Sequence, residues 1–139
     1  MTRTIRRELW FPQTPERVWR ALATSEALAA WMYPNDFEPR VGHHFTFRVP
    51  PKPQLESGLV VRCEVLTCVP PRELCFTWVV DAFLDTRVSY RLEADGAGTR
   101  VLFEHSGFSQ NQAFAGAAYG WSLMHGQLEK RLGRESEQP

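Results

Sequence analysis

The feature that most limits the fold of this chain is a run of alternating polar and apolar residues from Val41 to His105. A period of two is typical of strands that bury one face of a sheet. Turn-forming groups, of which Pro70-Pro71 and Asp95-Gly96-Ala97-Gly98 are the clearest, divide the run. With one further strand near the N-terminus, the pattern predicts an antiparallel sheet. The predicted strands are Thr4–Phe11, His43–Val49, Leu59–Val69, Arg72–Val80, Thr86–Glu93 and Thr99–His105.

Two short helices are expected after the first strand. Thr14 is suited to cap the first helix, because Pro15 fits the first helical position and Glu16 the first turn. Ser25 is expected to cap the second, which carries Trp31 on its apolar side.

A long helix is expected at the C-terminal end. Ser109-Gln110-Asn111-Gln112 matches a capping box, and Gly133 is the expected stop. The predicted apolar stripe consists of Ala117, Trp121, Met124, Leu128 and Leu132. Gly116, Gly120 and Gly126 each cost about 1 kcal/mol relative to Ala in a helix. They indicate a close backbone approach, a bend or local mobility.

The apolar positions of the strands predict one buried face with two lateral rows. The rows are Phe47, Val61, Trp78, Val88, His105 and Phe45, Cys63, Phe76, Tyr90, Phe103. A register shift of two residues would move the rows but keep the face. Cys75 falls on the face opposite Cys63, so free thiols are expected. Trp78 and His105 should lie roughly 10 Å apart, two strand spacings.

Composition excludes several classes of function. The chain has 139 residues, with 16 basic and 16 acidic side chains and no net charge, so no nucleic-acid partner is expected. No apolar run is long enough for a membrane span, and no signal sequence follows the basic N-terminus. The odd number of cysteines favours a cytoplasmic protein. Adjacent strand residues such as His43 and His44 face opposite ways, so the two imidazoles cannot bind one metal ion together. Neither a metal nor another cofactor is expected.

The aromatic side chains on the buried face, under the last helix, suggest a cavity for a largely apolar ligand. The alternative is that the rings simply fill the core. The candidate ligand-binding residues are Trp31, Phe45, Phe47, Phe76, Trp78, Tyr90, Phe103, His105, Trp121, Met124 and Arg7. Trp31, with Trp19, is also expected to hold the small helices in place.

His105 and Arg7 are the polar members of this set. His105 could anchor a ligand or act as an acid or base, or be hydrogen-bonded to nearby backbone at the strand end. Arg7 could pair with a ligand carboxylate, or turn outward through a bulge or a partly exposed position. No motif identifies a catalytic residue, and the sequence alone does not demand an enzyme.

Several motifs resemble the activator of heat-shock-protein-90 ATPase homologue group of the SRPBCC, or START-like, superfamily. They are Thr14-Pro15-Glu16-Arg17-Val18-Trp19, Trp31, Val41-Gly42, the segment 69–78, Gly98-Thr99-Arg100-Val101, His105-Ser106-Gly107 and Gly120-Trp121. The resemblance implies a single α+β domain over residues 1–139 with the helix-grip fold, in which a curved six-stranded antiparallel sheet wraps a long C-terminal helix. Residues 134–139 are expected to form a frayed tail.

The resemblance and the aromatic face together favour a binding protein for a small, apolar molecule. A cyclase- or hydrolase-type enzyme using the same cavity is one alternative, and a co-chaperone or protein-interaction module is another. A homodimer or a chaperone contact would use Tyr119 and Leu123, which lie on the outer side of the last helix.

Overall fold

The computed structural model describes residues 2–53 and 56–137. The strands are β1 (Arg3–Phe11), β2 (His44–Val49), β3 (Leu59–Val69), β4 (Glu73–Val80), β5 (Leu84–Asp95) and β6 (Gly98–Phe108). The helices are α1 (Pro15–Leu22), α2 (Ser25–Trp31) and α3 (Asn111–Glu137). The strands form one antiparallel sheet in the order β1-β6-β5-β4-β3-β2. The predicted α+β fold, with a six-stranded sheet and two short helices after the first strand, is confirmed.

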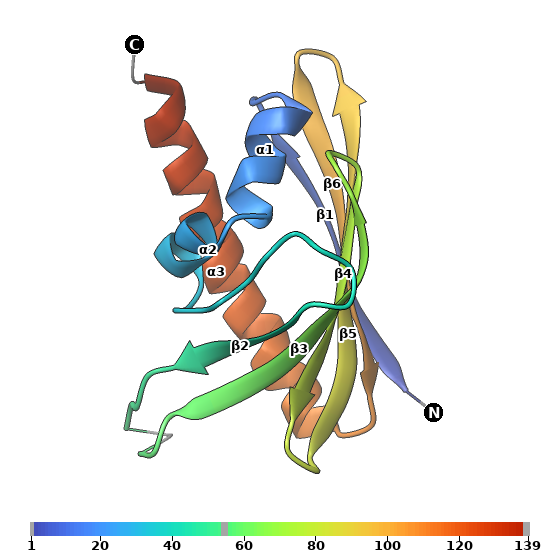
Figure 1. Ribbon diagram of the computed structural model, residues 1–139, viewed down its shortest axis with the longest axis vertical. Coiled ribbons are helices and arrows are strands. Elements are labelled where there is room, and N and C mark those ends of the chain that lie inside the picture. Colours follow the sequence, from blue (N-terminus) through green and yellow to red (C-terminus); the bar gives the residue numbers. More distant parts are fainter. Residues whose placement is uncertain (1, 54–55, 138–139) are drawn as a thin grey trace.

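The three helices lie on one face of the curved sheet (Figure 1). α3 runs diagonally across this face, and α1 and α2 lie beside its C-terminal half. The N-terminal half of α3 passes instead over the end of the sheet where β2 and β3 project (Figure 1). Only the C-terminal half of α3 therefore has a second layer of helix beside it.

Specific hydrogen bonds hold the helical layer together. Trp31 donates its indole N–H to the carbonyl of Ala21, 2.7 Å away, and so ties α2 to α1. Gln13 donates to the carbonyl of Leu132 in α3 at 3.1 Å. Thr99 of β6 donates to the carbonyl of Gln13 at 2.8 Å. The link between β1 and α1 is thus attached both to the sheet and to the long helix.

Two helix ends differ from expectation. The second helix is capped by Thr24, whose hydroxyl accepts from the Ala27 N–H, whereas Ser25 donates to Asn35. α3 continues past Gly133 to Glu137, because a glycine without a left-handed conformation does not end a helix. The expectations for Ser25 and Gly133 were therefore wrong.

The strand β6 also runs further than expected, to Phe108. Gly107 has a φ of +103°, and the pairing of β6 with β1 shifts at this point, since Thr4 faces Ser106 and Arg3 faces Phe108. The bulge interrupts the alternation, so His105 and Phe108 are both buried, with ring centroids 4.5 Å apart. Gly107 therefore shapes the inner face of the sheet.

The predicted register holds for two of the hairpins. Phe47 pairs with Val61 in β2–β3, and Tyr90 pairs with Phe103 in β5–β6, as expected. β4 is displaced by two residues, so that Phe76 lies opposite Val65 and Val88. Trp78 lies opposite Thr86. The face assignment is confirmed, but the two continuous rows were wrong.

Candidate functional site

A cavity of about 600 Å³ lies between the sheet and the N-terminal half of α3. β3 and β4 supply its apolar wall, with Leu59, Val61 and Val80 among the contributing side chains. The opposite wall runs from Gln110, the residue before α3, along the helix to Met124. This is the part of α3 that α1 and α2 do not accompany (Figure 1).

The structure brings only part of the predicted ligand-binding set to this cavity. The members that line it are Trp78, His105, Trp121 and Met124. Phe45, Phe47 and Phe76 pack against one another instead, with centroid separations between 5.3 and 6.1 Å, and none is more than 2% exposed. These three rings fill the core, which is the alternative that the sequence left open.

The remaining aromatic candidates surround His125, a residue for which the sequence predicted no role. Its ring lies 6.1 Å from Trp31, 6.0 Å from Tyr90 and 4.6 Å from Phe103. Tyr90 contacts the imidazole Nε2 through its hydroxyl at 3.0 Å. A ligand-binding role for Trp31, Tyr90 and Phe103 stays a prediction, outside the lining of the large cavity.

His125 could have been recognised from helical spacing. It follows Trp121 by one turn and precedes Leu128 by three residues, so it falls within the apolar stripe of α3. The structure buries His125 with Trp121, Leu128 and Leu132, whereas Met124 is only partly buried. Burial, followed by the positive charge of Arg7, lowers the pKa of His125 to about 4.

Arg7 is exposed at the rim of the helix–sheet interface. Its guanidinium donates to the carbonyl of Arg6 at 3.0 Å. It lines a separate groove of about 390 Å³ between β1 and α3, where His125 and Gly126 also lie. Arg7 therefore does not reach the large cavity, and its exposed position matches one of the alternatives drawn from the sequence.

His105 is fully inside the structure and both of its ring nitrogens are engaged. Trp121 of α3 donates its indole N–H to Nδ1 at 2.8 Å. Nε2 lies 2.7 Å from the hydroxyl of Thr86, and that hydroxyl donates to the carbonyl of Trp78 at 2.7 Å. The chain of contacts crosses from α3 through β6 and β5 to β4.

This network determines which nitrogen of His105 carries the proton. Because Nδ1 accepts from Trp121, the neutral ring must hold its proton on Nε2 and donate it to Thr86. Burial lowers the pKa of His105 to about 3, so the ring is neutral at physiological pH. The ring has no further lone pair to accept a hydrogen bond from a ligand. Its two hydrogen bonds connect the long helix to the sheet.

His105 and Trp78 are closer than the sequence predicted. Their ring centroids are 5.5 Å apart, not roughly 10 Å, because the shifted register brings Trp78 beside Thr86. Trp78 also lies 5.3 Å from Trp121 and 5.5 Å from Phe47. Trp78 thus occupies the boundary between the aromatic core and the cavity.

Several lining residues come from connections that carry no periodic signal. Tyr33 follows α2, Lys52 follows β2, and Phe83 lies in the turn between β4 and β5. Phe83 is 64% exposed. Alternation and helical spacing do not apply to loops, so these residues could not be placed from the sequence.

The glycines of α3 have open space beside them. A Cβ atom added at Gly116, Gly120 or Gly126 would meet no atom within 4 Å, which excludes a close backbone approach. Gly116 and Gly120 line the large cavity together with Ala113 and Ala117. The small residues therefore leave room on the helix side of the cavity.

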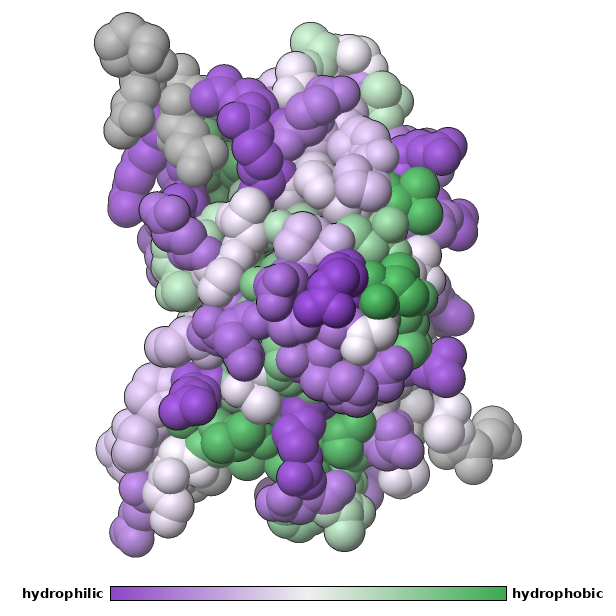
Figure 2. Space-filling model, viewed as in Figure 1, coloured by the Kyte–Doolittle hydropathy of each residue, from purple (hydrophilic) through white to green (hydrophobic). Residues whose placement is uncertain are grey.

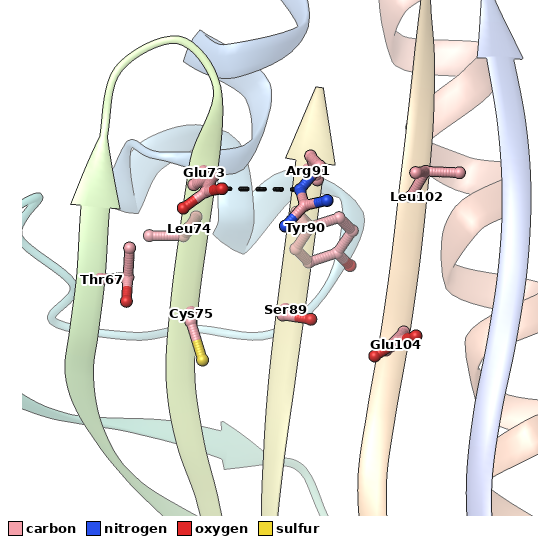
Figure 3. A pocket seen from close by; sticks show the side chains of 9 residues that line it. All are labelled: Thr67, Glu73, Leu74, Cys75, Ser89, Tyr90, Arg91, Leu102 and Glu104. Carbon is pink, nitrogen blue, oxygen red and sulfur yellow. Dashed lines mark ion pairs between the residues drawn. The ribbon is translucent and has the colours of Figure 1, made fainter. Parts of the chain in front are cut away.

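The opposite face of the sheet carries a shallow depression of about 220 Å³ (Figure 3). Glu73 and Arg91 form an ion pair there, with 3.5 Å between the carboxylate and the guanidinium. Cys75 lies nearby, and burial raises the pKa of its thiol, so it is a weak nucleophile. Cys63, on the inner face, and Cys75 are free thiols, as expected.

The outer surface mixes polar and apolar side chains. On the face shown in Figure 2, polar residues predominate and apolar residues occur in separate small groups. Tyr119 and Leu123 are exposed on α3, at 69% and 56%, and a role in dimer or partner contact stays a prediction. Within residues 2–53 and 56–137, no helix is long and apolar enough to span a membrane, and no group of three potential metal ligands occurs.

The fold and the cavity define a class of protein, a helix-grip domain with a hollow between its sheet and its long C-terminal helix. The model of one family, the activator of Hsp90 ATPase homolog 1-like proteins, matches residues 12–133. The chain belongs to this family. No curated protein matches the sequence significantly.

Solved structures share the fold. Protein MLL2253 from Mesorhizobium loti is 35% identical, with a TM-score of 0.87 over 95% of this chain and 98% of its own. CalU16 from Micromonospora echinospora is 24% identical, with a TM-score of 0.80 over 97% of this chain and 79% of its own. DynU16, a protein of the dynemicin biosynthetic locus, is 19% identical, with a TM-score of 0.81 over 94% of this chain and 47% of its own. The last two show similarity of fold alone.

Proposed function

We propose that this protein binds a small, largely apolar molecule in the cavity beneath the N-terminal half of α3. The observation that carries the proposal is the cavity itself, whose volume of about 600 Å³ falls within the range of small-molecule sites. Its walls combine aliphatic strand residues with the rings of Trp78 and Trp121. Such walls favour transfer of an apolar ligand from water by roughly 25 cal/mol for each Å² buried.

The α3 glycines add a second argument. Larger residues at Gly116 and Gly120 would fill open space and raise the helix propensity of α3. Packing therefore gives no reason for glycine at these two positions. A sequence that departs from local preference beside a cavity is typical of a functional site. We take the cost of these glycines as support for a cavity that must stay open.

An enzyme that uses His105 as its acid or base is less well supported. Trp121 occupies the only lone pair that a neutral His105 has available at Nδ1. Burial also lowers the pKa of His105 to about 3, far from the value suited to proton transfer near neutral pH. His105 contributes a wall and a helix anchor to the proposed site.

The test is a titration with N-phenyl-1-naphthylamine, a neutral naphthalene dye whose emission increases in apolar surroundings. We expect saturable binding, and at 100 times the dissociation constant an increase in unfolding free energy of about 2.7 kcal/mol. The variant Gly120→Leu should place a side chain in the cavity and abolish binding. Gly126→Leu makes the same change outside the cavity lining and should retain it.

Two results would contradict the proposal. One is the absence of saturable binding by the wild-type protein. The other is equal affinity of the dye for Gly120→Leu and wild type, since the dye would then occupy another surface.

A further inference from the structure

The polar groups of the cavity are informative because most of its wall is apolar. Trp78 lines the cavity and is only 8% exposed. Trp31 and Trp121 donate their indole N–H groups to a carbonyl and to His105. The N–H of Trp78 has no acceptor among the residues that the structure describes, and protein atoms do not seal it off. The open space beside this ring is the cavity, so a bound molecule can accept its hydrogen bond.

Tyr33 offers a second donor. Its ring lines the cavity, and no hydrogen bond to its hydroxyl occurs within the described part of the chain. Burial raises the pKa of Tyr33, so the phenol keeps its proton. Tyr33 can therefore donate to a ligand at physiological pH.

The only charge contributed by the described lining residues is positive. It belongs to Lys52, an exposed side chain in the connection after β2. No Asp or Glu within residues 2–53 and 56–137 lines the cavity, and Lys52 makes no ion pair in that part of the chain. Gln110 and Gln112 add amides, which can donate or accept.

The lining side chains offer more hydrogen-bond donors than acceptors, and this excess indicates which polar group a ligand carries. An indole N–H and an ammonium group can only donate. We infer that the cavity takes an apolar organic anion, such as an aromatic or aliphatic carboxylate or sulfonate, whose acidic group accepts from Trp78 and Lys52. This inference rests on the proposed function and adds the polar group that the ligand must carry.

The test compares two dyes with the same ring frame. 1-Anilinonaphthalene-8-sulfonate is N-phenyl-1-naphthylamine with one added sulfonate. The measured quantity is the ratio of their affinities, the anionic over the neutral dye, determined for each variant by fluorescence titration. The two dyes bury the same rings, so a change in ring burial caused by a variant cancels in this ratio. The difference in solubility between the dyes is the same for every variant and does not affect the comparison.

We expect Trp78→Phe and Lys52→Met each to lower this ratio about three- to tenfold, with the neutral dye affected less than twofold. Lys130→Met removes the same charge from the exposed face of α3, outside the cavity, and should leave the ratio unchanged. The effect of Lys52→Met should shrink at high salt, because a charge at the solvent boundary is screened. Gly120→Leu should abolish binding of both dyes and so locate them in the cavity.

The outcomes separate the two proposals. If the neutral dye binds and Gly120→Leu blocks it, but neither Trp78→Phe nor Lys52→Met changes the ratio, the anionic ligand class is wrong and the binding function stands. If wild type binds neither dye, the binding function itself fails. If Lys130→Met lowers the ratio as much as Lys52→Met, the effect is one of net charge and the assignment of Lys52 is wrong.

Discussion

At the scale of single residues, His105 shows how one buried polar side chain can join several elements. Trp121 of α3 donates to one ring nitrogen, and Thr86 of β5 contacts the other. If the ring were removed, the Trp121 indole N–H would lose its acceptor in a dry interior, and the Thr86 hydroxyl would keep only the hydrogen bond that it donates to the Trp78 carbonyl. The sequence placed His105 on the inner face, but its partners come from the helix and from a neighbouring strand.

The buried imidazoles predict that stability falls in mild acid. Burial lowers the pKa of His105 to about 3 and that of His125 to about 4, whereas both titrate near 6.5 in an unfolded chain. Above pH 6.5 neither state is protonated, so the stability is fully present. Below that value the unfolded chain takes up protons that the folded chain does not, and unfolding becomes easier.

We expect each histidine to lower the unfolding free energy by about 1.4 kcal/mol for every pH unit below 6.5, until its folded-state pKa is reached. Urea denaturation between pH 7 and pH 5 measures the slope. His125→Gln should reduce the slope by the contribution of one histidine, about 1.4 kcal/mol per pH unit. A stability that is flat over this range would mean that the imidazoles are accessible to protons in the folded state.

Thr86 provides a second prediction at this scale. Thr86→Val removes the hydroxyl that joins His105 to the Trp78 carbonyl, leaving both without their partner. The unfolding free energy should drop by about 1–3 kcal/mol. Thr86→Ser keeps the hydroxyl and should lose less. A loss of stability in Thr86→Ser without one in Thr86→Val would show that the methyl group, rather than the hydrogen bonds, matters at this position.

At the scale of elements, the strands illustrate what periodicity can resolve. Alternation with a period of two identifies the inner face, but it is unchanged when a strand slides by two residues. β4 is displaced in this way, and its pairing with β3 shifts between Val65 and Thr67. The displacement moves Trp78 from the expected place opposite Val61 and Val88 to one opposite Thr86.

The glycines of α3 give a prediction for an element. Gly126 has no atom within 4 Å of the position where a Cβ would stand. Gly126→Ala should therefore raise the unfolding free energy by about 0.5–1 kcal/mol, through helix propensity and a less flexible unfolded chain. Thermal or urea unfolding measures the change. A loss of stability would mean that the backbone of α3 needs the freedom of glycine at this point.

At the scale of the whole molecule, one hydrophobic core joins all elements. The buried cluster extends from Val18 and Trp31 in the short helices through Phe76 and Val88 in the sheet to Leu132 near the end of α3. The hydrogen bonds from Gln13 to Leu132 and from Thr99 to Gln13 cross the same boundaries. The helical layer and the sheet should therefore not separate before global unfolding.

We expect a single cooperative transition. Helix content followed by far-ultraviolet circular dichroism and tryptophan burial followed by fluorescence should give the same midpoint in urea. The neutral dye should shift both midpoints equally, because it binds between the layers. Two separate midpoints would show that α3 detaches from the sheet as an independent unit.

The candidate site was only partly predictable. Trp78, His105, Trp121 and Met124 could be placed on the cavity side because they fall in the apolar phase of a strand or helix. Phe45, Phe47 and Phe76 share that phase but fill the core. The position of a residue in the strand or helix pattern determines which way its side chain points. Whether it meets open space depends on the side chains of the element packed against it.

The sequence by itself determined the element order, the inner face of the sheet and the family, since these depend on local periodicity, turns and motifs. The tertiary structure alone decided where the space lies, because α1 and α2 accompany one half of α3 and small residues occupy the other. It also decided the role of His105, whose partners Thr86 and Trp121 are distant in sequence. Alternation carries no information on such long-range distances, which follow only from the register and the packing of all layers together.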